Sequence, residues 1–388
     1  MFMQLKRGLQ IAGMFLFLGF APVFAGDLPW PFRVPFLISA RFSDFQNYSG
    51  VPYFHGGTDL AVPAGTELYT PISGTVDIFT YRIDAGKSPL KFAYLRHPFR
   101  ERSENSDGSP VSSSASPKGS YASRYVEVAI TDSLGRRWMF RHVDGQTIPR
   151  RVTELDGTGK ILPAGEKIGA IIPWSEAVYP ETRRYDHLHF EITDAEGWYL
   201  NPERLMTTVS DTQPPEIKGI WFVHNEGDTV FSSSTEKRFP APIVFGDIDI
   251  IARIDETMNG SRYFSTPWSV SAAISRVTAT TTELLGSPVE VFRFDRLPMK
   301  GDRTQFATTV YKERLRVDGI ELGSQGNSQM RVFYFILTNG DPISGYDPAR
   351  SIHTSALPDG RYLVRVSATD FTGNTASASQ EFVIQNTR

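Results

Sequence analysis

The chain has 388 residues, of which 40% are hydrophobic and 21% charged, and its formal net charge is -3. This composition excludes a wholly disordered chain, and the length allows two or three domains. A charge so close to zero gives no sign of the basic face that a nucleic-acid partner requires. Because the chain has no cysteine, disulfides, thiolate metal ligands, a catalytic thiol and a lipid anchor on an N-terminal cysteine are excluded as well.

The first 25 residues have the pattern of a signal peptide. Lys6 and Arg7 precede an apolar run that ends in Val23-Phe24-Ala25, so cleavage is expected after Ala25. The alternative is a membrane anchor, but the uninterrupted apolar run is shorter than the roughly 20 residues of a spanning helix. We therefore expect export to the periplasm or the extracellular space, with no stable membrane span after processing.

Residues 26–208 form the first predicted domain, and its segments alternate like strands. They read "GTELYTPISGTVDIFTY", "RYVEVAITD", "RRWMFRHVDG" and "HLHFEITD", and in "YVEVAI" successive side chains point to opposite faces. The serine-rich stretch 101–120 interrupts the pattern and is expected to be a mobile surface loop, or alternatively a wall of a groove.

Residues 209–215 end in Pro214-Pro215 and are expected to be a linker. Strand-like runs then continue over 216–388, so the sequence predicts a β-sandwich there and an all-β fold for the whole chain. Such a second domain could dock polymers of the compartment to which the chain is exported or a protein partner, or cover the site of the first domain.

Two short motifs carry the chemistry of a metal site. In "HLH", His187 and His189 lie two residues apart, so on a strand they point the same way about 6.6 Å apart. In "HGGTD", His55 and Asp59 would lie about 13 Å apart on a straight strand. Two ligands of one metal lie much closer, so the chain must bend, and Gly56 and Gly57 permit that bend.

Together the motifs offer His55, Asp59 and one of the two HLH histidines. Two histidines and one carboxylate with an open fourth position are typical of a catalytic zinc site. Manganese and iron remain alternatives because both accept nitrogen and oxygen ligands.

These motifs resemble the lysostaphin/LytM-type zinc endopeptidases of bacterial cell walls. "HGGTD", "FRHV" and "HLH" match the family's metal and catalytic motifs, and "PAGTELYTPISGTV", "LPAGEKIGAI" and "LNP" agree with it over about residues 50–205. The resemblance implies the metal ligands His55, Asp59 and His189, and the catalytic histidines His142 and His187. It also implies a two-sheet antiparallel β domain of duplicated hybrid-motif type, here followed by an Ig-like β-sandwich.

The chain departs from the family pattern in four places, one of which is the serine-rich insertion before Tyr125. Phe140 stands where tyrosine is usual, Val143 replaces leucine, and "IPWSEAVYPETRRYD" replaces a Gly/Ser-rich turn. The last change concerns substrate specificity rather than the metal.

The resemblance leads us to expect a zinc metalloendopeptidase that hydrolyses peptide cross-links of peptidoglycan, acting on stem peptides or cross-bridges. One alternative is a non-catalytic zinc-binding regulator of other cell-wall hydrolases. Another is a β-rich carrier or phosphotransfer domain, which export to a compartment without ATP disfavours. The sequence leaves open which of His142 and His187 is the general base.

Overall fold

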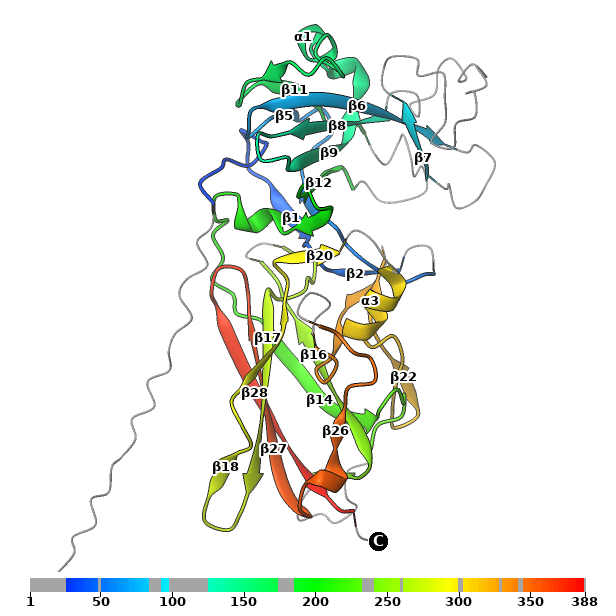
Figure 1. Ribbon diagram of the computed structural model, residues 1–388, viewed down its shortest axis with the longest axis vertical. Helices are drawn as coiled ribbons and strands as arrows, with labels where there is room; N and C mark the ends of the chain where they lie inside the picture. The colour runs from blue at the N-terminus through cyan, green and yellow to red at the C-terminus, as the bar shows by residue number, and fades with distance from the viewer. Residues whose placement is uncertain are drawn as a thin grey trace, which may run out of the picture.

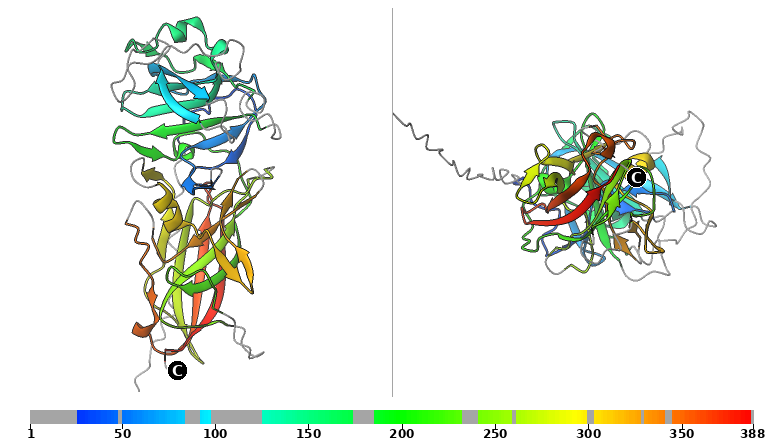
Figure 2. Two further views of the ribbon diagram at one scale, coloured as in Figure 1. Left: turned by 90° about the vertical axis from the view of Figure 1, so that its right-hand side faces the viewer. Right: turned by 90° about the horizontal axis from the view of Figure 1, so that it is seen from below.

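The computed structural model describes residues 26–47, 50–83, 92–97, 125–173, 185–231, 241–258, 261–298, 303–327, 330–340 and 345–386. Within these ranges nearly all regular elements are strands, as the sequence predicts, and they form two halves stacked along the long axis (Figures 1 and 2). The predicted signal peptide and the serine-rich loop lie outside the described residues. No helix in the described part is long and apolar enough to cross a membrane.

One ten-stranded sheet organises the N-terminal half. Its main path, in spatial order, is β1 (Leu37–Ala40), β4 (Thr58–Ala61), β12 (His187–Thr193), β9 (Arg137–Asp144), β8 (Tyr125–Thr131), β6 (Gly74–Ile83) and β10 (Ile161–Leu162). At its edges β7 (Phe92–His97) pairs with β6, β13 (Trp198–Leu200) pairs with β12, and β20 (Arg296–Pro298) pairs with β13. All these pairings are antiparallel.

Smaller elements complete this half. A second, two-stranded sheet joins β5 (Glu67–Tyr69) to β11 (Lys167–Ala170), and a hairpin joins β2 (Phe45–Gln46) to β3 (Tyr53–Phe54). The helices are short: α1 (Arg150–Thr153) and the 3-10 turns Gly145–Thr147 and Pro202–Arg204.

Two sheets face each other in the C-terminal half. One contains β14 (Glu216–His224), β16 (Asp247–Asp255), β25 (Tyr334–Ile336) and β26 (Ile352–His353). The other contains β15 (Ile243–Val244), β28 (Thr375–Ile384), β27 (Gly360–Thr369), β17 (Ser269–Val277), β18 (Thr282–Leu284) and β19 (Val289–Arg293). Inward residues of both sheets share one apolar core, the arrangement of a β-sandwich.

The remaining elements of this half are α3 (Arg303–Val310), the hairpin β21 (Leu315–Val317) to β22 (Ile320–Leu322), the pair β23 (Gln325–Gly326) with β24 (Arg331–Val332), and the 3-10 turn Thr354–Ala356. Each strand-like run that the sequence singles out in the described ranges forms a strand.

The two halves share a core at their junction. The segment between β1 and β4 carries Phe42, Phe45 and Phe54. These three side chains belong to the apolar cluster of the C-terminal sandwich. The ring of Tyr311 lies 5.4 Å from that of Phe45 and 5.6 Å from that of Phe54. Figure 1 shows β2, β20 and α3 together at this level. The boundary at 209–215 stays a prediction, and tight packing crosses it.

Candidate metal centre

The central strands of the large sheet bring the HLH histidines to the carboxylate of the HGGTD motif. His189 on β12 is the register partner of Asp59 on β4 and of Arg141 on β9, so these side chains share one face. Leu188 and Phe190 point to the opposite face and are fully buried in the apolar core. The alternation expected for HLH is confirmed.

The bend expected between His55 and Asp59 is also present, because β3 ends at Phe54 and β4 begins at Thr58. Gly57 lies against the neighbouring strand: a Cβ there would be 2.5 Å from the Phe190 carbonyl oxygen and 3.0 Å from His189 Nε2. The glycine is therefore required for a close backbone approach beside the site.

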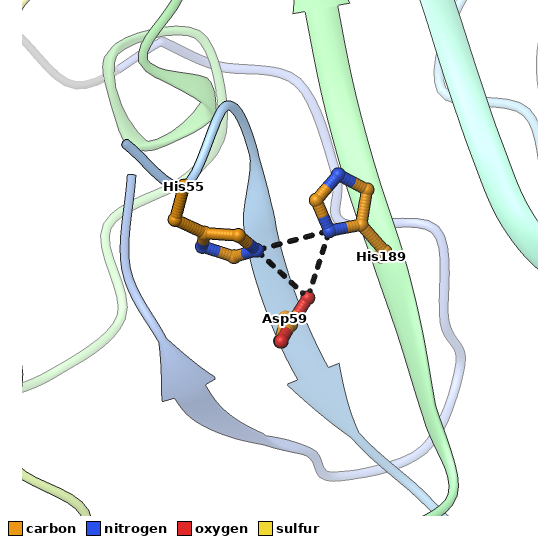
Figure 3. Close-up of side chains that lie close together, drawn as sticks. All are labelled: His55, Asp59 and His189. Atoms are coloured by element: carbon orange, nitrogen blue, oxygen red, sulfur yellow. Dashed lines mark hydrogen bonds and ion pairs between the residues drawn. The ribbon is translucent and has the colours of Figure 1, made fainter. Parts of the chain in front are cut away.

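Three ligand-type atoms meet in a small triangle (Figure 3). His55 Nε2 lies 3.1 Å from Asp59 Oδ1 and 3.0 Å from His189 Nδ1, and the third edge, Asp59 Oδ1 to His189 Nδ1, is 2.9 Å. Tetrahedral zinc with bonds of roughly 2.0–2.2 Å places its ligand atoms about 3.3–3.6 Å apart. A shift of a few tenths of an ångström would seat the ion, so these residues could hold a metal.

The hydrogen bonds outside the triangle fix which ring nitrogens face inward without a proton. His55 Nδ1 lies 2.8 Å from the Arg41 carbonyl oxygen, which can only accept, so Nδ1 carries the proton and Nε2 is a bare lone pair. His189 Nε2 faces Glu191 Oε2 at 3.4 Å, which favours the bare lone pair at Nδ1. Three acceptors at this distance repel one another unless a cation lies between them.

The pKa values of Asp59 and His189 are both shifted from their ordinary values. Although burial opposes it, the charges of His55 and His187 hold the pKa of the Asp59 carboxyl well below its usual range. Burial also lowers the pKa of His189, yet hydrogen bonds to Asp59 and Glu191 raise that pKa above its ordinary value overall. Both shifts favour positive charge in the middle of the triangle, which is the place that a metal ion would take.

The second oxygen of Asp59 and the outer nitrogen of His189 have partners of their own. The Tyr185 hydroxyl lies 3.2 Å from Asp59 Oδ2. Glu191, beside His189, accepts two bonds from Arg141 Nη2, at 3.0 and 3.2 Å. With the Arg41 carbonyl behind His55, every member of the triangle is oriented from outside, as protein metal ligands usually are.

A β-bulge delivers the fourth histidine. Strict alternation in "FRHV" would place His142 on the same face as Phe140, whose ring is buried in the core against Phe190. Instead the register between β8 and β9 shifts at this point, and His142 has a φ of +67°. Both changes turn its ring to the site, where it lies 4.3 Å from the ring of His187.

Both of these histidines are neutral near pH 7. Burial lowers the pKa of His187 and, together with the neighbouring His187 and His189 charges, holds that of His142 well below the usual range. His187 Nδ1 donates to the Tyr185 carbonyl oxygen at 2.9 Å, so its Nε2 is an acceptor, 3.7 Å from Asp59 Oδ2. A neutral imidazole with an inward lone pair is a competent general base.

All five residues named from the sequence therefore meet in one place. The sequence did not point to Tyr185, Arg41 or the Glu191–Arg141 pair as partners of the ligands. Glu191 had a signal, because it continues the site-facing alternation of "HLHFE". Trp174, Tyr179 and Arg183-Arg184, which mark the departure from the family pattern, lie outside the described residues.

The other histidines that the structure describes with side chains lie elsewhere. His224 packs on the rings of Phe231 and Phe245, and the exposed His353 pairs with Asp247 at 2.7 Å. His97 lies on β7, away from the strands that carry the triangle.

No protein-family model matches this sequence, and no curated protein gives a significant match. Among solved structures, Helicobacter pylori Csd3 aligns at a TM-score of 0.28 and 16% identity, over 48% of this chain and 36% of that one. The SpoIIQ–SpoIIIAH pore-forming complex aligns at a TM-score of 0.27 and 13% identity, over 47% of this chain and 92% of that one. A chain described as "putative peptidase M23 from pseudomonas aeruginosa" aligns at a TM-score of 0.24 and 17% identity, over 49% of this chain and 56% of that one. This chain thus spans about a third of the Csd3 chain, and likeness at this level assigns no function.

Proposed function

We propose that this protein is a zinc metalloendopeptidase of the lysostaphin/LytM type that hydrolyses peptide cross-links of bacterial peptidoglycan. The observation that carries the proposal is the triangle of His55, Asp59 and His189, whose inward atoms lie 2.9–3.1 Å apart beside two neutral histidines. A structural zinc site normally has four protein ligands, whereas three with an open position are typical of hydrolases.

When bound, zinc supplies Lewis-acid polarisation of a carbonyl oxygen and lowers the pKa of a coordinated water. The chain's own residues hold and move the protons. His187 is the better candidate for the base, because its Nδ1–H is committed to the Tyr185 carbonyl and its Nε2 faces Asp59. His142 then stabilises the developing oxyanion or protonates the leaving amine.

The peptidoglycan substrate follows from the motif resemblance together with the expected export. An exported amide hydrolase has wall peptides within reach, and the motifs that match are those of wall endopeptidases. The choice between stem peptides and cross-bridges depends on the bond that is found cleaved.

The test is a digest of purified peptidoglycan by residues 26–388, zinc-loaded, with and without chelator, read by mass spectrometry. We expect new amine ends that disappear with chelator. His187→Ala and His142→Ala should each abolish release while zinc stays bound, and His353→Ala, a surface histidine, serves as the matched control. Cleavage by His142→Ala at the wild-type rate would remove that residue from the mechanism.

Bound zinc without any release would contradict the peptidase and favour a zinc-binding regulator of other wall hydrolases. That second function would then be tested by adding the protein to a wall hydrolase and measuring its rate.

A further inference from the structure

We infer that the C-terminal half helps to position the metal centre: Tyr311 from that half, and Asp44, which is hydrogen-bonded to Thr266 of that half, are positioning residues that hold the backbone which orients His55. The inference rests on the proposed zinc site and concerns how that site is kept in place. It differs from the expectation that the second domain docks the wall or covers the groove.

The segment that carries His55 is tied at both ends of a short loop. The His55 backbone N–H donates to the Asp44 carbonyl at 2.8 Å, and the Ser43 N–H donates to the His55 carbonyl at 2.8 Å. His55 Nδ1 donates to the Arg41 carbonyl, also at 2.8 Å. Residues 41–44 therefore set both the place of His55 and its tautomer.

Asp44 links this loop to the C-terminal half. Its Oδ2 accepts from the Arg41 N–H at 3.0 Å, and its Oδ1 accepts from the Thr266 N–H at 2.7 Å. Its side chain is buried, so a lost acceptor would leave a backbone donor unsatisfied away from water.

Tyr311 makes the second link. Its hydroxyl donates to the Ser43 carbonyl at 2.8 Å and lies 3.2 Å from Thr266 Oγ1, and its ring packs on Phe45 and Phe54 on either side of the loop. Ser43 itself has a φ of +71°, a conformation that a non-glycine residue holds only when its surroundings impose it. The sandwich supplies those surroundings.

The Arg41 guanidinium adds a hydrogen-bonded link across the same junction. It is buried, with Nη1 3.3 Å from Glu256 Oε1 and Nε 3.5 Å from Glu203 Oε1. Asp211, Glu256 and Asp370 form a second carboxylate group close enough to share a cation, and the Arg41 guanidinium lies against it. Arg41 thus holds its carbonyl beside His55 while its guanidinium contacts residues on both sides of the junction.

The experiment measures zinc affinity of the full chain by chelator competition, and the d–d spectrum after cobalt substitution. We expect Asp44→Asn to weaken zinc binding about 10- to 100-fold, the range for groups behind a ligand. Tyr311→Phe should weaken it about 2- to 10-fold, the effect of one hydrogen bond. The cobalt spectrum of both should change, because the orientation of His55 changes.

Matched controls come from the C-terminal half. Asp249→Asn also removes a buried carboxylate that accepts a backbone N–H, from Glu226, and Tyr362→Phe also removes a hydroxyl bond to a carbonyl, that of Pro358. Both should lower the melting temperature of the metal-free protein but leave zinc affinity within about twofold and the cobalt spectrum unchanged.

Wild-type zinc affinity and spectrum in both Asp44→Asn and Tyr311→Phe would overturn the inference. If Asp44→Asn does not fold, Tyr311→Phe alone decides. A wild-type protein that binds no zinc would refute the proposed function and the inference together, whereas zinc binding and cleavage with unaffected variants would refute only the positioning role.

Discussion

Replacing Gly57 by alanine should damage the metal centre from a position that bears no ligand. A Cβ there would lie 2.5 Å from the Phe190 carbonyl oxygen, and contacts below 3.0 Å essentially never occur, so β4 must move from β12 by about 0.5 Å or more. Asp59 and His189 are register partners on those two strands, and the added Cβ would also lie 3.0 Å from His189 Nε2, so the His189 ring must turn away from the place that it shares with Asp59. Overpacking of this kind costs about 1–3 kcal/mol.

The matched control is the neighbouring glycine. A Cβ at Gly56 would lie 3.1 Å from the Tyr199 ring, a side chain that can shift by a few tenths of an ångström. If the strain of Gly57→Ala falls on the metal-bound state, about 1–3 kcal/mol is a 5- to 150-fold loss of zinc affinity. Isothermal titration of both variants checks this, and equal affinities for Gly57→Ala and the wild type would refute the reasoning.

Three further outcomes are expected. Glu191→Gln weakens the hydrogen bond to His189 and the ion pair with Arg141, and should lower zinc affinity about 10- to 100-fold. Chelator competition measures this, with the exposed Glu154→Gln as control. An unchanged affinity would contradict it. Burial raises the pKa of Glu256 to about 9, against roughly 4.3 in an unfolded chain. Its bound proton therefore stabilises the folded state fully below about pH 4.3, and this stability is lost as the pH rises towards 9. Between about pH 5 and 9 the melting temperature should fall less in Glu256→Gln than in the wild type. Parallel curves of melting temperature against pH would contradict this. A chain ending at Thr208 should be insoluble or free of zinc, since Phe42, Phe45 and Phe54 lose their apolar partners. Metal analysis after gel filtration checks this, and a soluble, zinc-loaded fragment would refute it.

Period-two alternation predicts the all-β fold, and the ligand types and spacing of HGGTD and HLH, which are local signals, predict that His55, Asp59 and an HLH histidine lie together. The family resemblance adds His142 to this group, and the roles of the five residues stay predictions. Alternation alone would place the ring of His142 in the core. The bulge that corrects this depends on how β8 pairs with β9, and pairing is a long-range property. The sequence also does not reveal the Arg41 carbonyl as the partner of His55. Its position depends on Asp44 and on Tyr311, and Tyr311 lies more than 200 residues away in the chain.

The pairing of β13 with β20 has a consequence for how such a chain can evolve. Trp198, Tyr199 and Leu200 extend the sheet that carries Asp59 and His189, and their outer edge is paired with Leu297 and its neighbours from the other half. A recombination event that exchanged the second half for an unrelated domain would leave that edge open to other chains. The half that carries the candidate metal centre is therefore expected to be inherited together with its sandwich, and the two are expected to diverge as one unit rather than as separately shuffled modules.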